Sequence, residues 1–348
     1  MVLAALFLAP ILLAAPQVLR ANAHEGVIHT TDQTWSGNLS LSQDVVIASG
    51  ATLVIQSGTH INITEDITIT IQGNLQIQGT PEAPVIIWGS WVAETSVQAR
   101  WQGFLLNAGS ISTVTHAMIS DSRGGFDVES GADLTLESTH FIDPIIGVWN
   151  KGSLAGAGLE CQSATTSCLR VDGTANLNTV SSATSAAVVH ISSGGDAEIE
   201  LIESNQDSDV LVLDGGSTFS GEINAAGFTR MIRASDSVTA TILPVVTGAG
   251  ETLIDASSVD GLVLVDGNHT NATVSSLIIG SIQELELSSG IYHCDGTVNC
   301  IDAIIEGELS LTNTSFEQQT SESSVFARLR GEGNLITENI SIETSSTL

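Results

Sequence analysis

GADLTLES begins at Gly131, GSLAGAGL at Gly152, GTANLNTV at Gly173 and GDAEIELIES at Gly195. Together with Gly109 and Gly216, these glycines are spaced by 22, 21, 21, 22 and 21 residues. After most of them apolar and polar residues alternate, which is typical of a strand with one buried face. Glycine supplies turn conformations that β-branched residues resist. The segment therefore predicts a repeated unit of strand and turn.

The repeat continues on both sides of this segment. GATLVIQSGT begins at Gly50 and GNLQIQGT at Gly73, and related segments begin at Gly280, Gly307 and Gly333. A unit of about 21–23 residues cannot bury its apolar face alone, so it must stack on its neighbours. Such a unit is too short for a propeller blade and lacks the leucine-rich-repeat pattern. The chain is therefore expected to be all-β, a parallel β-solenoid of about 13 turns.

Two regions carry a family resemblance. GATLVIQSGTHINIT (Gly50–Thr64), GNLQIQGTPEAPVIIWGS (Gly73–Ser90) and Trp101-Gln102-Gly103-Phe104 resemble the start of right-handed parallel β-helix repeat proteins of the pectin-lyase-like class. SDSRGGFDVESGADLTLESTHFID (Ser120–Asp143) resembles the repeats that follow. The resemblance covers roughly residues 40–345 and implies a right-handed parallel β-helix. Because this class includes lyases, hydrolases, adhesins and passive surface proteins, it does not imply one function.

The N-terminus predicts export. Residues 1–19 are apolar apart from Gln17, and Ala21-Asn22-Ala23 has the small-x-small pattern of a cleavage site. Met1–Ala23 is therefore interpreted as a secretory signal peptide. A membrane anchor is the alternative, disfavoured by Pro10 and Pro16 and by the short apolar run. We expect a secreted or cell-surface protein.

The remaining chain is expected to contain a cap and a solenoid. Residues 24–45 are long enough to cover the first strand edges as an N-terminal cap. Residues 46–348 are assigned to the parallel β-helix. The 36 residues between Gly73 and Gly109 exceed one repeat, and the surplus predicts an inserted loop near residues 88–101.

The charge balance excludes two classes of partner. The chain carries 39 Asp and Glu against 9 Lys and Arg, for a formal net charge of −30. Nucleic-acid binding and docking on anionic membranes both need clustered cations. Hydrophobic residues make up 42% of the chain, so it can bury a large core. Polysaccharides and other surface proteins remain as partners.

Four cysteines fit an oxidising compartment. Cys161 and Cys168 are seven residues apart, and Cys294 and Cys300 are six apart. Local pairing, Cys161–Cys168 and Cys294–Cys300, would fasten one turn each. The alternative of a zinc site lacks a C-x-x-C motif and a histidine at ligand spacing.

Catalytic candidates are sparse. Polysaccharide lyases of the resembled fold use an Arg or Lys base beside carboxylates that hold Ca²⁺, and Asp121, Arg123, Asp127 and Asp143 are the residues that come nearest to such a set. The competing interpretation is that the arginines neutralise an acidic surface. Asp121 and Asp143 could serve hydrolysis only if the fold brought their carboxylates to the separation that glycosidic cleavage needs. The aspartate and G-H-G motifs of the fold's hydrolases do not occur.

No cofactor or dedicated metal site is predicted. The carboxylates could bind Ca²⁺ diffusely, but neither an EF-hand nor a glycine-aspartate nonapeptide occurs. His116 and His140 are 24 residues apart and are expected to stack on neighbouring turns.

Aromatic residues and sequons suggest surface chemistry. Trp88, Trp91 and Trp101 could stack on sugar rings as a carbohydrate-binding site, or could close the inserted loop over the first turns. N-glycosylation sequons of the form N-x-S/T occur at Asn38, Asn62, Asn268, Asn271, Asn313 and Asn339.

These features favour a non-catalytic function. The expected protein is an exported, acidic β-helix that acts as a structural or adhesive element at the cell surface. The alternatives are a carbohydrate-active enzyme, either a polysaccharide lyase or a glycoside hydrolase, and a carbohydrate-binding module on the same fold.

Overall fold

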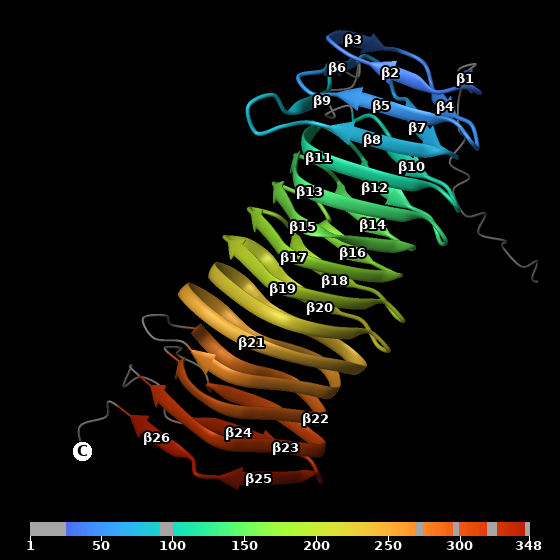
Figure 1. Cartoon of the computed structure of the whole chain (residues 1–348). Helices are drawn as coiled ribbons and strands as arrows, with labels where there is room; N and C mark the ends of the chain where they lie inside the picture. The colour runs from blue at the N-terminus through green and yellow to red at the C-terminus, as the bar shows by residue number, and fades with distance from the viewer. Residues whose placement is uncertain (1–25, 91–99, 269–273, 295–298, 319–325, 345–348) are drawn as a thin grey trace, which may run out of the picture.

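The chain forms one parallel β-solenoid of about 13 turns (Figure 1). The computed structural model describes residues 26–90, 100–268, 274–294, 299–318 and 326–344, with 75% of the chain in strands and no helix among these residues. Successive turns stack in chain order from the N-terminal (blue) to the C-terminal (red) end. At a strand spacing of ~4.8 Å the stack is roughly 60 Å long. The predicted all-β solenoid is confirmed.

The strand bounds show a regular progression along the stack. The first three turns have three short strands each: β1 (Val27–His29), β2 (Gln33–Trp35), β3 (Asn38–Leu41), β4 (Val45–Ile47), β5 (Thr52–Gln56), β6 (His60–Ile63), β7 (Thr68–Ile71), β8 (Asn74–Gln78) and β9 (Val85–Gly89). The following turns alternate a short strand with a ten-residue strand: β10 (Gly103–Leu106), β11 (Ile111–Ser120), β12 (Gly124–Val128), β13 (Asp133–Ile142), β14 (Ile146–Asn150), β15 (Ser153–Gln162), β16 (Ser167–Val171), β17 (Thr174–Ala183), β18 (Ala187–Ile191) and β19 (Asp196–Asn205). The remaining strands are β20 (Asp207–Leu213), β21 (Thr218–Asn268), β22 (Val274–Cys294), β23 (Ile301–Gln318), β24 (Ala327–Arg330), β25 (Asn334–Glu338) and β26 (Ser341–Thr344).

Each ten-residue strand is a fused pair. The first half of β11 pairs with β8, and its second half pairs with β9. His116, between the halves, has φ of 45°, which bends the chain without interrupting the strand. Every turn therefore has a first strand (β1, β4, β7, β10, β12, β14, β16, β18, β20), followed by a second and a third strand.

The interior is a set of apolar columns. Ile47, Ile71, Leu106 and Val128 stand in register on four successive first strands, and all are fully buried. Burial of each such side chain stabilises the fold by about 1.5–3 kcal/mol. Phenylalanines form a neighbouring column, in which the rings of Phe104 and Phe126 stack at 5.0 Å. This in-register stacking is why the unit must repeat.

The repeated glycines fall at two adjacent register positions, Gly109 with Gly131 and Gly152 with Gly173 and Gly195, and they serve two purposes. Gly131 has φ of 83°. Its carbonyl oxygen accepts a hydrogen bond of 2.7 Å from the N–H of Gly109 on the preceding turn. Gly173 has no positive φ; a Cβ there would lie 2.3 Å from the carbonyl oxygen of Gly152. Gly131 therefore provides a left-handed backbone conformation, whereas Gly173 allows the backbones of two successive turns to lie close together.

The segment assigned to the cap is the first turn. Its strands β1, β2 and β3 pair in parallel with β4, β5 and β6. Trp35, Leu39 and Leu41 are partly buried and pack against the core. The described part of residues 24–45 therefore covers the core by continuing the solenoid.

Two sequence predictions fall mainly outside the described residues. The predicted signal peptide, residues 1–23, lies outside them. So does most of the predicted loop near 88–101, because residues 91–99 are not described. Over the described chain, no helix has the length and apolarity needed to cross a bilayer.

Both predicted disulfides are present. Cys161 pairs with Cys168, and Cys294 pairs with Cys300. Each joins the end of one turn to the first strand of the next, at the same corner of the solenoid. The pairing is typical of an extracellular, oxidising environment.

Candidate functional site

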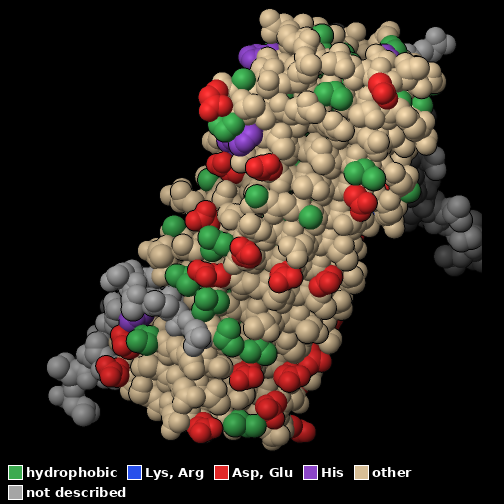
Figure 2. All heavy atoms as spheres, viewed as in Figure 1, with side chains coloured by type: hydrophobic (Ala, Val, Ile, Leu, Met, Phe, Trp, Pro, Cys, Tyr) green, Lys and Arg blue, Asp and Glu red, His purple; other side chains and the backbone are tan. Residues whose placement is uncertain are grey.

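The faces of the solenoid differ in charge. The face in Figure 2 carries scattered Asp and Glu side chains and shows no Lys or Arg. The described Lys and Arg residues all lie in a first strand, within three residues of one, or in the parts of β21 and β24 that continue the stack of first strands: Arg100, Arg123, Lys151, Arg170, Arg230, Arg233, Arg328 and Arg330. The second and third strands are therefore acidic, whereas the first strands carry both charges.

The centre of this charged surface spans β12 to the first part of β21. Asp127, Trp149, Arg170, His190, Val212 and Arg233 stand at one register position on six successive turns. We call these residues and their ionic partners the mixed-charge stripe; the partners are Glu129, Lys151, Asp172, Asp209, Asp214, Arg230 and Asp255.

At one end of the stripe, Lys151 lies between two carboxylates of the preceding turn. Its Nζ is 2.8 Å from Asp127 Oδ1 and 2.8 Å from Glu129 Oε1. Burial raises the pKa of Asp127 by more than the contact with Lys151 lowers it. Burial lowers the pKa of Lys151, but Asp127 and Glu129 raise it overall.

The next group is built on Trp149. Its Nε1 donates to Asp172 Oδ2 at 2.7 Å, and Arg170 Nε donates to Asp172 Oδ1 at 3.1 Å. Lys151 Nζ and Arg170 Cζ lie 4.1 and 4.8 Å from the centre of the Trp149 ring. Burial raises the pKa of Asp172, but hydrogen bonding to Ser192, Trp149 and Arg170 lowers it overall. The indole is thus held by two cation–π contacts.

Arginines dominate the other end of the stripe. Arg230 binds Asp209 through two hydrogen bonds, 2.6 and 3.0 Å long, and a third reaches Asp255 at 3.3 Å. These bonds raise the pKa of Arg230. Arg233 Nη1 lies 3.4 Å from Asp209 Oδ2, and His190 Nε2 lies 2.9 Å from Asp214 Oδ2. Both arginines and the histidine therefore have an acidic partner.

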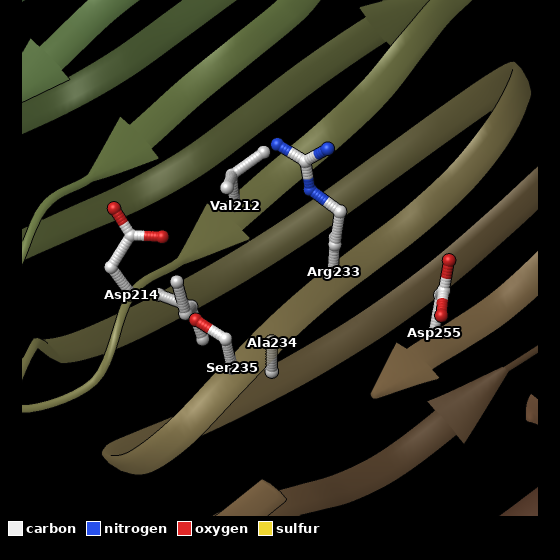
Figure 3. Close-up of a pocket in the computed structure, with 7 residues that line it drawn as sticks. Val212, Asp214, Arg233, Ala234, Ser235 and Asp255 are labelled. Carbon is white, nitrogen blue, oxygen red and sulfur yellow. The ribbon is translucent and has the colours of Figure 1, made fainter. Parts of the chain in front are cut away.

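A cavity opens in the stripe at Val212 (Figure 3). Val212 is the short residue between His190 and Arg233, so the column has a gap there. The cavity has a volume of about 320 Å³ and is lined by Val212, Leu213, Asp214, Arg233, Ala234, Ser235 and Asp255. Asp214 and Asp255 lie on opposite sides of Arg233. The charged and hydroxyl-bearing residues of the lining offer hydrogen-bond donors and acceptors to the cavity.

The four predicted catalytic residues do not form one set. Asp121 and Asp143 occupy equivalent corner positions on adjacent turns, with φ of 55° and 52°. Arg123 pairs with Asp66 at 3.6 Å, whereas Asp127 pairs with Lys151. Arg123 and Asp127 therefore have ionic partners other than the corner carboxylates Asp121 and Asp143.

The tryptophan hypothesis needs correction at Trp101. Trp101 is only 1% exposed, donates from Nε1 to Ser120 O at 3.0 Å and packs on Phe104. Because its ring is in the core, it cannot stack on a sugar. Trp88 is partly exposed and contacts His60 edge-on, and Trp91 lies outside the described residues.

The sequons differ in accessibility. Asn38, Asn313 and Asn339 are exposed, and Asn339 Nδ2 donates to Asn313 Oδ1 at 3.0 Å. Asn62 is only partly exposed and its Oδ1 is buried. The Asn268 side chain and Asn271 lie outside what the structure describes.

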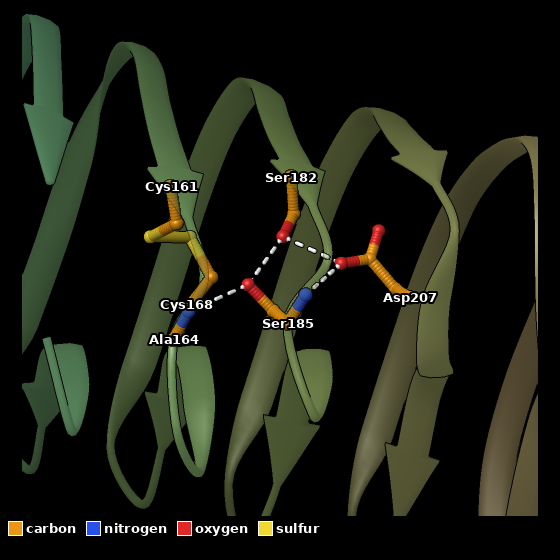
Figure 4. The surroundings of a disulfide bond; sticks show 6 residues. All are labelled: Cys161, Ala164, Cys168, Ser182, Ser185 and Asp207. Carbon is orange, nitrogen blue, oxygen red and sulfur yellow. Dashed lines mark hydrogen bonds between the residues drawn. A yellow bond between two sulfur atoms is a disulfide. The ribbon is translucent and has the colours of Figure 1, made fainter. Parts of the chain in front are cut away.

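A buried polar cluster lies beside the first disulfide (Figure 4). Asp207 is 2% exposed and accepts hydrogen bonds from Ser185 N, Ser204 Oγ, Ser182 Oγ and Asn205 N, at 2.6, 2.7, 3.0 and 3.1 Å. Burial raises the pKa of Asp207 despite these bonds. The cluster is sealed from solvent and holds the corner together.

Neither similarity to known proteins nor a metal-binding cluster assigns a function to this site. The chain matches no protein-family model, no curated protein and no solved structure. Within the described ranges, no three His, Cys, Asp or Glu residues are placed to hold a metal ion. The pectin-lyase-like class thus remains a resemblance of sequence.

The sequence did not show that the residues of the mixed-charge stripe lie together. Arg230, Arg233, Asp209 and Asp255 stood out only as scattered charges, and Lys151, Arg170 and Asp214 did not stand out at all. Their signal was weak because most partners lie 21–25 residues apart with varying turn lengths. The sequence did contain one indication of the stripe: nearly all Lys and Arg residues recur at similar positions within the repeat.

Proposed function

We propose that this protein is an exported, non-catalytic β-solenoid that serves as a rigid structural or adhesive element at the cell surface, with the mixed-charge stripe as its contact face. The observation that carries the proposal is the confinement of the described cations to the first-strand side of an otherwise acidic rod. Acidic faces at a net charge of −30 repel one another and repel anionic surfaces. The stripe, whose charges are paired, is where a partner approaches at the lowest electrostatic cost.

The pairing of cations also supports a non-catalytic role. Every Lys and Arg in the described chain except Arg100 forms an ion pair with Asp or Glu. Gripping an acidic polysaccharide requires cations free to exchange partners. Lyase chemistry on polyuronates is thereby disfavoured.

Adhesion of the mature chain to cells and to extracellular matrix tests the proposal. Arg233→Glu reverses a charge within the stripe and is expected to reduce adhesion at least tenfold. Glu200→Lys, on an exposed acidic face, is the matched control and should leave adhesion within twofold. Equal adhesion of all three proteins would contradict the assignment of the stripe as contact face. Product formation on a polysaccharide panel, with or without Ca²⁺, would contradict the non-catalytic role.

The cavity at Val212 favours a second candidate, a carbohydrate-binding module. A sugar presents hydroxyl groups and an apolar C–H face, and the cavity lining holds hydrogen-bonding groups of Arg233, Asp214 and Asp255 beside Val212. A glycan array read with the wild type, Asp255→Ala and the control Arg328→Ala tests this candidate. Binding lost only in Asp255→Ala would support it, and the same glycan signal in all three would remove it.

A further inference from the structure

Lys151 is the single lysine in the sequence of 348 residues. It follows β14 and reaches back to the preceding turn, where Asp127 lies on β12 and Glu129 directly follows that strand. The lysine side chain is 25% exposed, and those of Asp127 and Glu129 are 32% and 41% exposed. A primary amine is therefore held against two carboxyl groups in a partly desolvated site.

The two contacts of Lys151 are not equivalent. Nζ donates a hydrogen bond to Glu129 Oε1 at 2.8 Å. It is equally close to Asp127 Oδ1, yet that buried oxygen has no partner with hydrogen-bond geometry among the described residues. The Trp149 ring lies against Nζ at 4.1 Å and limits access of water from that side. Asp127 is thus held against the amine in an ion pair, with Oδ1 as close to Nζ as Glu129 Oε1 is.

We propose that Lys151 Nζ and Asp127 Cγ join in an amide bond that covalently links two successive turns of the solenoid, with Glu129 as the proton carrier. The inference does not depend on the proposed surface role.

The reaction balances without any co-reactant. Glu129 accepts a proton from the Lys151 ammonium and passes it to Asp127, which leaves a neutral amine and a protonated carboxyl group. The amine nitrogen attacks Cγ to form the C–N bond and gives up a second proton to Glu129. The C–O bond to the departing hydroxyl then breaks, and Glu129 returns the proton so that this oxygen leaves as water. The products are one amide and one water molecule, with no change in oxidation state.

Geometry favours this condensation. Fixing two reacting groups in contact gives an effective molarity of roughly 10⁵–10⁸ M, which shifts an amide equilibrium that is unfavourable between free molecules in water. Burial, which raises the pKa of Asp127, favours the protonated carboxyl group that loses water more readily. An arginine at position 151 would supply charge but no comparable nucleophile. The chemistry thus requires the residue type that occurs once in this chain.

Digestion of the purified mature protein with trypsin, after denaturation and reduction, gives a direct test. The cleavable sites in this region are Arg123, Lys151 and Arg170. A linked Lys151 is not cleaved, so mass spectrometry should find one peptide, Gly124–Arg170, lighter than its sequence by the mass of one water, about 18 Da. Fragmentation should place the link between Asp127 and Lys151.

Three variants make the outcome decisive. Lys151→Arg and Asp127→Ala should abolish the loss of mass, and Glu129→Gln, which keeps both joined residues, should leave most of the chain unlinked. The separate peptides Gly124–Lys151 and Gly152–Arg170 from the wild type would overturn the proposal. So would a loss of mass that persists in Lys151→Arg, since it would report dehydration of an aspartate elsewhere, or a link that maps to Glu129.

Discussion

Asp207 offers the sharpest test of how the interior of this solenoid is stabilised. Its carboxylate is buried and accepts four hydrogen bonds from residues of two adjacent turns. Figure 4 shows the two from Ser182 and Ser185. Asp207→Ala removes the acceptor and leaves the backbone N–H groups of Ser185 and Asn205 without it. Each buried donor left unsatisfied costs about 1–3 kcal/mol. The two serine hydroxyls can turn elsewhere, since Ser182 already bonds Ser185.

The expected net loss is therefore about 3 kcal/mol, because removal of the carboxylate's own burial cost offsets part of the two unsatisfied amides. Hydrogen exchange at the Ser185 and Asn205 amides measures the loss of stability at this corner. A local measurement is needed because the turns of a repeat protein can open separately. A change of 1.4 kcal/mol corresponds to a factor of ten, so exchange at Ser185 and Asn205 should accelerate roughly 100-fold. Glu200→Ala, at an exposed position of β19, should change neither rate by more than about twofold.

The same variant carries a pH signature. Because burial raises the pKa of Asp207 above its unfolded value of about 3.9, the folded state binds the proton more tightly than the unfolded state. The contribution of Asp207 to stability is thus complete below the unfolded pKa and declines as pH rises through the folded pKa. Denaturant unfolding should show a larger difference between wild type and Asp207→Ala in mild acid than at neutral pH. Hydrogen exchange that accelerates less than threefold at both amides would refute the reasoning. So would a difference in unfolding free energy between wild type and Asp207→Ala that grows toward neutral pH.

Three further outcomes are expected. Gly173→Ala should destabilise the protein by about 1–3 kcal/mol in thermal unfolding, because its Cβ would lie 2.3 Å from a carbonyl oxygen of the neighbouring turn; an unchanged midpoint would contradict this close approach. Replacing both Cys161 and Cys168 by Ala should cost about 2.5 kcal/mol in denaturant unfolding, the loop-closure value for a short bridge, and a null effect would mean that the corner is held by packing alone. In a host that glycosylates, Asn38→Gln should remove one glycan by intact mass whereas Asn62→Gln should remove none; a glycan on Asn62 would show that its buried Oδ1 does not protect it.

Much of the fold could be predicted from local pattern. The spacing of glycines such as Gly109 and Gly131 indicated a repeat, and alternation around them indicated strands buried on one side. The pairing of Cys161 with Cys168 followed from proximity in sequence. These features depend on neighbouring residues only, so they are visible without knowing the register.

The register itself could not be predicted. His116 and His140 were expected to stack because 24 residues separate them, but His140 pairs with Met118, and His116 lies at the bend with φ of 45°. Turns vary in length by a residue or two, and each difference changes which side chains meet on adjacent turns.

Local pattern is enough to specify a stack of short strands, because apolar alternation and periodic glycine leave few other ways to bury the core. The contacts between turns depend on the folded register: Lys151 meets Asp127, Arg230 meets Asp209, and Trp101 lies inside whereas Trp149 lies on the mixed-charge stripe. Strand pairing at ~4.8 Å brings residues of successive turns into contact, and the corner of each turn, rather than distance along the chain, selects the partners.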